Sequence, residues 1–341
     1  MNNTTCYINF SYNRILLPSL YSSLLCFGLP SNSLALYGLY RLVKAENLLP
    51  IYVMNLLLSD LFQMCTMPFW IDYYWKERKW HFGETACLIV GFIFYVSLFV
   101  SVGFLCCIAL ERYLATVHPI WFHSHHRLRY ACALCASIWV AFVLLFLAVN
   151  TTRGNESDLC FEHYPITKEH AIFRLTTMTM GFPLPFLLQL FLYIGIRRSL
   201  HFATSVPLND KKRINRLLSL VLALFVLFFG PYHVISYVRY VYVVLQEDSC
   251  DFETKLDIYL QVARGLLSLN CLLDPIMYIF VCRNAQKEIL AAFPFLKKPF
   301  TLLGFQKQFQ ESHTHNDFAI NSVAGSAAPQ ISFLSFFFKM K

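Results

Sequence analysis

The sequence predicts an all-α membrane protein, a bundle of seven transmembrane helices followed by a short amphipathic cytoplasmic helix. Apolar residues make up 57% of the 341 residues and charged residues only 14%, and the mean hydropathy is +0.50, which is unlike a soluble domain. About 20 consecutive apolar residues are needed to cross the hydrocarbon core as a helix. Seven stretches meet this requirement, at 17–40, 49–72, 87–113, 129–150, 171–197, 216–243 and 257–282.

The basic residues set the expected orientation of these spans. The net charge of +8 would suit a nucleic-acid partner, but Lys and Arg gather in the connections after spans one, three and five and in the tail. This placement argues against a nucleic-acid partner. By the positive-inside rule, it predicts a plasma-membrane protein with its N-terminus outside and its tail in the cytosol. We therefore expect an extracellular N-terminus (1–16), a transmembrane domain (17–282), an amphipathic helix (283–300) and a cytoplasmic tail (301–341).

Glycosylation sequons and cysteines fit this topology. The sequons all fall on segments predicted to be extracellular, and begin at Asn2, Asn3, Asn9, Asn150 and Asn155. Four cysteines also lie outside the predicted spans or at their outer ends: Cys6, Cys87, Cys160 and Cys250. In an oxidising compartment we expect them to form disulfides, but their spacing alone leaves the pairing open.

Polar residues inside the predicted spans are costly and mark function. Asp60 in span two and Asp274 in span seven lie at a depth similar to Ser101 and Asn270. We expect these four residues to form a hydrated cluster that binds a sodium ion or shares a proton. The alternative is a set of ordinary hydrogen bonds between helices. No other cofactor or metal is expected.

Prolines recur deep in the spans at Pro68, Pro185, Pro231 and Pro275. Because proline removes a backbone donor and its ring clashes with the preceding turn, each predicts a local kink.

At the inner end of span three stands Glu111-Arg112-Tyr113. An arginine at this depth needs a carboxylate, and Glu111 can hold Arg112 until a conformational change releases it. The sequence contains no zinc-protease, nucleophile-elbow or phosphate-loop motif, which argues against an enzyme. It also lacks the paired Gly/Pro-interrupted spans of many transporters.

These motifs together resemble the rhodopsin-like (class A) G-protein-coupled receptors over almost the whole chain. The matching residues are Asn32, Asn55, Asp60, Cys87, Arg112, Trp139, Pro185, Tyr193, Phe229-Gly230-Pro231 and Asp274-Pro275-x-x-Tyr278. The family usually has Asp at position 111, Trp at 229 and Asn at 274. The resemblance implies coupling to a heterotrimeric G protein through Glu111, Arg112, Tyr113, Tyr193 and Tyr278, with arrestin as a further partner. It also implies the disulfides Cys87–Cys160 and Cys6–Cys250.

Longer stretches, such as TMPFWIDYYW and FLCCIALERYLATVHP, resemble the proton-sensing and lysolipid-linked subgroup. The resemblance implies that protons, an anionic lysolipid or an oxidised fatty acid is the stimulus. Gln261 and Phe142 replace a histidine and an acidic residue that are usual in proton-sensing relatives.

Candidate residues exist for each stimulus. Histidine titrates near neutral pH, and the outward-facing candidates for proton sensing are His81, His163, His170 and His233. Arginine forks bind phosphate or carboxylate, so we expect an anionic ligand to contact Arg239, Arg264, His233, Tyr95 and Tyr237. A salt bridge from Arg264 to Asp72 is the structural alternative. Among functions, a nucleotide receptor is the main alternative and a membrane transporter a weaker one.

Overall fold

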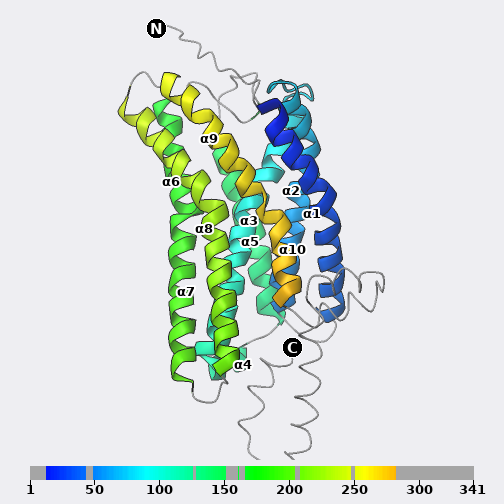
Figure 1. Ribbon diagram of the computed structural model, residues 1–341, viewed down its shortest axis with the longest axis vertical. Helices are drawn as coiled ribbons and strands as arrows, with labels where there is room; N and C mark the ends of the chain where they lie inside the picture. Colours follow the sequence, from blue (N-terminus) through cyan, green and yellow to red (C-terminus); the bar gives the residue numbers. More distant parts are fainter. Residues whose placement is uncertain are drawn as a thin grey trace, which may run out of the picture.

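The protein folds into an elongated bundle of helices that run roughly along its longest axis (Figure 1). The computed structural model describes residues 13–43, 49–125, 128–150, 160, 166–203, 208–246 and 250–281. Within these ranges the elements are α1 (Asn13–Val43), α2 (Leu49–Trp75), α3 (Glu84–Val117), α4 (Pro119–His125), α5 (Leu128–Asn150), α6 (Lys168–Gly181), α7 (Pro183–Phe202), α8 (Leu208–Leu245), α9 (Cys250–Ser268) and α10 (Asn270–Val281).

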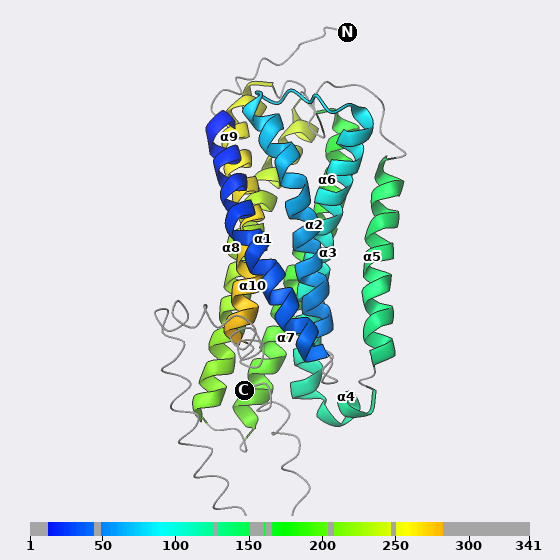
Figure 2. The ribbon, with the colours of Figure 1, turned by 90° about the vertical axis from the view of Figure 1, so that its right-hand side faces the viewer.

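The seven predicted spans correspond to α1, α2, α3, α5, the α6–α7 pair, α8 and the α9–α10 pair. Four segments are long and apolar enough by themselves to cross a membrane: Glu84–Val117, Lys168–Phe202, Leu218–Leu245 and Asp251–Pro275. The short helix α4, which the sequence analysis did not predict, lies near one end of the bundle, and α5 stands at its edge (Figure 2). The predicted helix 283–300 and the tail lie outside the described residues.

Two spans are interrupted, at places near but not at the predicted prolines. Phe182 separates α6 from α7 with φ −134° and ψ −61°, directly before Pro183 in the first turn of α7. Proline is favoured in that first turn because the amide it lacks would have no helical partner there. The last span breaks at Leu269, ahead of Pro275. Pro275 itself lies inside α10.

Pro275 nevertheless shapes the bundle through the carbonyl that it leaves without a helical donor. In a regular helix the carbonyl of Cys271 would accept from the amide four residues later, but Pro275 has no amide hydrogen. Asn32 of α1 supplies the missing donor, because its Nδ2 donates to the Cys271 carbonyl at 2.7 Å. A buried asparagine thus fastens α1 to α10.

Close packing, rather than removal of apolar surface from water, holds helices together within a bilayer. The outer half contains a cluster of aromatic side chains, in which the Trp70 ring contacts that of Phe94 at 5.6 Å between centroids. Further inward, Gly195 of α7 leaves room for the Tyr113 ring of α3. A Cβ at position 195 would collide with the Tyr113 ring, so that ring or the helix carrying it would have to shift.

Candidate functional site

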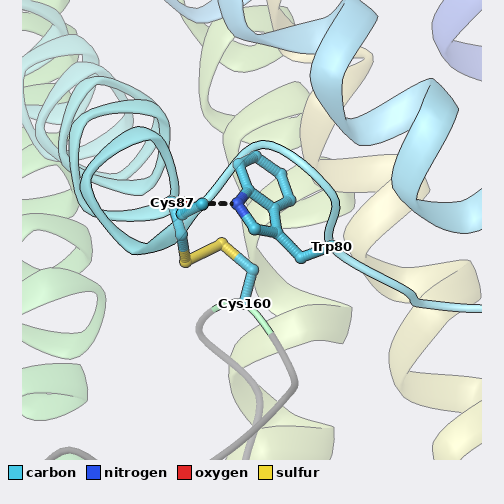
Figure 3. The surroundings of a disulfide bond; sticks show 4 residues. Trp80, Cys87 and Cys160 are labelled. Atoms are coloured by element: carbon cyan, nitrogen blue, oxygen red, sulfur yellow. Dashed lines mark hydrogen bonds between the residues drawn. A yellow bond between two sulfur atoms is a disulfide. The ribbon is translucent and has the colours of Figure 1, made fainter.

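A disulfide joins the first turn of α3 to the connection between α5 and α6. Cys87 pairs with Cys160, which confirms the pairing implied by the family resemblance (Figure 3). Cys160 is only 2% exposed and packs into the outer aromatic cluster. Trp80 lies beside the bridge, and its Nε1 donates to the carbonyl of Gly83 at 2.7 Å, which braces the turn before α3.

The other predicted extracellular modifications fall outside the described residues. Cys6 and the side chain of Cys250 are among them, so the second disulfide stays a prediction. The same holds for the sequons, at Asn2, Asn3, Asn9, the side chain of Asn150, and Asn155.

Helix α9 carries two buried carboxylates one turn apart, and each pairs with an arginine from a different element. Asp257 Oδ2 accepts from Arg78 Nη2 at 2.6 Å, and both side chains are 0% exposed. Glu253 Oε2 accepts from Arg239 Nη2 at 2.6 Å, and its Oε1 accepts from the amide of Ile166 at 3.3 Å. This turn of α9 therefore ties together α8, the α2–α3 connection and Ile166, two residues before α6.

Arg239 was predicted to contact a ligand, and the structure gives it an internal counter-ion instead. Its guanidinium donates twice to Glu253 Oε2, from Nε at 3.2 Å and from Nη2 at 2.6 Å. The charge of Arg239 is compensated within the protein.

Arg264 lies deeper in α9 and does not pair with Asp72. Its Nη1 donates to the Tyr74 hydroxyl at 2.6 Å and to Gln261 Oε1 at 3.1 Å. Asp72 forms its ion pair with Lys76 on its own helix at 2.8 Å, so the alternative Arg264–Asp72 bridge was wrong. Gln261 also donates to Asp257 Oδ1 at 3.2 Å, which links Arg264 to the buried ion pair.

Arg174 on α6 escaped the sequence analysis because a single arginine near the outer end of a span resembles an ordinary interfacial residue. It is half-buried, its Nε donates to His170 Nε2 at 3.2 Å, and its Cζ lies 5.8 Å from the centre of the Tyr95 ring. It also interacts electrostatically with Tyr232 and Tyr240 of α8. These neighbours come from α3 and α8, so only the folded structure brings them near Arg174.

The remaining predicted ligand and proton residues divide into buried and exposed groups. His233 is 7% exposed, donates from Nδ1 to the Phe229 carbonyl at 2.7 Å and stacks on Phe182. The hydroxyl of Tyr237 hydrogen-bonds that of Thr179 on α6. His81 is exposed in the α2–α3 connection, and His163 lies outside the described residues.

The four residues of the predicted ion or proton cluster do gather in the middle of the bundle. Ser101 Oγ donates to Asp60 Oδ1 at 3.3 Å, and Asn270 Nδ2 donates to Asp274 Oδ2 at 2.7 Å. The two carboxyl groups interact electrostatically with each other across α2 and α10. Ser59 extends the network by a 2.8 Å hydrogen bond to Ser101.

At the inner end of the bundle, the predicted coupling residues lie on α3, α7 and α10. Glu111 is 8% exposed, Arg112 is half-buried, and the Tyr113 ring packs against Phe191 of α7. Tyr193 of α7 hydrogen-bonds Ser219 of α8 at 2.9 Å between hydroxyls. The side chain of Tyr278 lies outside the described residues.

Comparison with known proteins identifies this architecture. A family model described as "7 transmembrane receptor (rhodopsin family)" matches residues 31–278. The chain is 34% identical over 290 residues to human G-protein coupled receptor 68, covering 84% of the chain and 78% of that protein. It is 30% identical to human G-protein coupled receptor 65, covering 85% and 89% of the two chains. It is 32% identical to the human uracil nucleotide/cysteinyl leukotriene receptor, covering 80% and 74%.

These relatives are receptors and not enzymes, which confirms the functional class expected from the motifs. Coupling to G proteins and insertion as a multi-pass membrane protein follow from the same match, over a region that contains all seven spans at least in part. The chain belongs to the rhodopsin family of seven-transmembrane, G-protein-coupled receptors.

Proposed function

We propose that this receptor resides in the plasma membrane with its N-terminus outside and is activated by an anionic lipid. The agonist would carry a phosphate or carboxylate head group, as a lysolipid or an oxidised fatty acid does. It would bind in the outer half of the bundle, beneath the connection that carries Cys160.

The observation that carries this proposal is the convergence of three arginines from three helices. Arg174, Arg239 and Arg264 come from α6, α8 and α9, and Tyr232 interacts electrostatically with both Arg174 and Arg264. Glu253 compensates the charge of Arg239, but no carboxylate among the described residues forms an ion pair with Arg174, and an unpaired charge within a bundle is expensive. An anion seated beside Arg174 would supply the missing negative charge, since arginine suits both phosphate and carboxylate.

One relative favours a second candidate with the same chemistry. The uracil nucleotide/cysteinyl leukotriene receptor is named for two anionic ligands, one a nucleotide and the other a lipid. A nucleotide carries several negative charges and would also suit a cluster of arginines. An alkyl chain on the ligand separates these candidates, because a lipid has one to pack against the aromatic side chains around Tyr95 and a nucleotide has none.

Acid is the second stimulus that we propose, acting together with the anion. His170 Nε2 accepts a hydrogen bond from Arg174, and a protonated imidazole cannot accept one there. Protonation would therefore put a second positive charge beside Arg174 and favour an anion. His81, His163 and His233 are the other candidates, of which His81 is exposed and His233 lies buried among aromatic rings.

Second-messenger responses in cells that express the full chain test the proposal. The ligands are 18:1 lysophosphatidic acid, 9-hydroxyoctadecadienoic acid, its methyl ester and uridine diphosphate, each at pH 7.8 and 6.4 as roughly the range over which histidine titrates. We expect an anionic lipid to act, its neutral ester to be inactive, and acid to increase potency. A full response to the ester, or responses to none of the anions, would contradict the proposal.

We further propose that the cluster of Asp60, Ser101, Asn270 and Asp274 binds a sodium ion or shares a proton. Two neighbouring carboxyl groups in a medium of low dielectric cannot both stay ionised without a cation. On the cytosolic side, we propose that Arg112 leaves Glu111 on activation and meets a G-protein helix, and that arrestin later binds the same face with Tyr113, Tyr193 and Tyr278.

A further inference from the structure

Helix α6 carries an arginine whose guanidinium fork is open. Arg174 uses its Nε to donate to His170 Nε2 one turn earlier, at 3.2 Å. Its two terminal nitrogens donate to no acceptor in the parts of the chain that the structure describes, and no carboxylate there forms an ion pair with it. The donors that arginine uses to grip an anion are therefore available.

The two neighbouring arginines at the outer end make a useful contrast. Arg78 and Arg239 are each matched by a buried carboxylate, Asp257 and Glu253, at 2.6 Å. The fold thus supplies an acid for the arginines that hold the helices together. Arg174 is left facing the interior with a histidine and three phenol rings.

These rings form a suitable wall for a charged group. Tyr95 of α3 lies face-on within 5.8 Å of the Arg174 guanidinium, which is a cation–π distance. Tyr232 and Tyr240 of α8 are within electrostatic range, and so is Arg239, which is paired with Glu253. Tyrosine hydroxyls can donate to an anion oxygen while their rings pack against the alkyl chain of a lipid.

We infer that Arg174 is the residue that binds the acidic head group of the agonist, with its fork presented by His170 and backed by Tyr95. This inference rests on the proposed function, since it assigns the contact for the proposed anion. A fork with two parallel donors selects a phosphate or carboxylate over a hydroxyl or a quaternary amine.

The test measures binding to the purified full-length receptor in nanodiscs of neutral phosphatidylcholine. The three anions are 18:1 lysophosphatidic acid, 9-hydroxyoctadecadienoic acid and uridine diphosphate, and the methyl ester of the second serves as a neutral lipid. The variants are Arg174→Ala, Arg174→Gln and Arg174→Lys. The matched control is Lys168→Ala, which removes an exposed positive charge from the start of the same helix.

A hydrogen-bonded charge contact corresponds to a loss of about 10- to 150-fold in affinity when one partner is removed. We expect losses in that range for Arg174→Ala and Arg174→Gln, a smaller loss for Arg174→Lys, and no change for Lys168→Ala. The neutral ester should bind wild type and Arg174→Ala equally. Whichever anion binds wild type identifies the source of the head group.

The possible failures are distinct. If wild type binds none of the anions, the proposed function is wrong, and this inference, which rests on it, is overturned as well. If wild type binds an anion and Arg174→Ala binds it equally well, the proposed function stands and this inference is overturned. The melting temperature without ligand is recorded for every variant. A variant that melts much earlier yet keeps wild-type affinity assigns Arg174 to stability and likewise overturns it.

Discussion

The buried ion pair between Arg78 and Asp257 should be the most sensitive contact at the outer end of the receptor. Both side chains are fully buried and the charged atoms are 2.6 Å apart. Removing one partner leaves the other charge buried without compensation, at a cost of about 3–5 kcal/mol. At roughly 2 °C per kcal/mol for a chain of this size, Asp257→Asn should lower the apparent melting temperature by roughly 6–10 °C.

The same helix offers a matched control. Asp251 and Lys255 also form an ion pair on α9, at 2.7 Å, but their side chains are 83% and 74% exposed. Exposed pairs contribute little to stability because solvent screens them. Asp251→Asn should therefore leave the melting temperature unchanged within error.

The measurement is a thermal scan of purified receptor in detergent at one fixed scan rate, since unfolding of such proteins is commonly irreversible. The double variant Arg78→Met/Asp257→Leu adds a second arm, because replacing both charges by apolar groups of similar size is often neutral or stabilising. We expect it to recover most of the lost stability. The reasoning is refuted if Asp257→Asn melts like Asp251→Asn, or if the double variant is worse than the single one.

Three further predictions concern the middle and inner parts of the bundle. Arg112→Ala should abolish agonist-stimulated nucleotide exchange on the G protein at unchanged surface expression, and normal exchange would remove Arg112 from coupling. Asp274→Asn should weaken the effect of sodium on agonist affinity by removing one of two facing carboxyl groups, and an unchanged sodium titration would leave the pair with a structural role only. Gly195→Ala should destabilise the receptor by about 1–3 kcal/mol because the added methyl meets the Tyr113 ring. Its control is Gly230→Ala, where the nearest atom would lie at 3.7 Å and melting should change little; equal melting of the two variants would show that α3 and α7 yield easily.

The sequence predicted the membrane spans, which follow from the length of apolar stretches. It also predicted the contact between polar residues that lie at similar depths within those spans. Asp60 and Asp274 were expected to gather because charges inside spans seek partners, and they do interact. The Cys87–Cys160 bridge required the family resemblance, since four cysteines predicted to be extracellular do not determine their own pairing.

The outer ion pairs could not be predicted, because they depend on backbone geometry between the spans. Arg78 follows Glu77 in a turn where both residues adopt positive φ, 55° and 64°, and this turn brings its side chain to Asp257 of α9. Sequence spacing contains no trace of such a turn when neither residue is glycine. The sequence did contain a signal for the acidic partners of these ion pairs. Glu253 and Asp257 are four residues apart at the start of an apolar span, and this spacing predicts that both lie on one face of the helix.

The break at Leu269 divides the last span into two helices, each attached to the rest of the bundle by its own contacts. Helix α9 is attached through Glu253 to α8 and through Asp257 to the connection after α2. Helix α10 is attached to α1 because the Cys271 carbonyl accepts a hydrogen bond from Asn32. A movement of α9 can therefore reach α10 through the break at Leu269, which lies next to Asn270, the residue that hydrogen-bonds Asp274 one turn later. The sodium ion or proton that we propose for the cluster of Asp60, Ser101, Asn270 and Asp274 would bind beside this break and stiffen it, which would limit how far a movement of α9 is passed to α10.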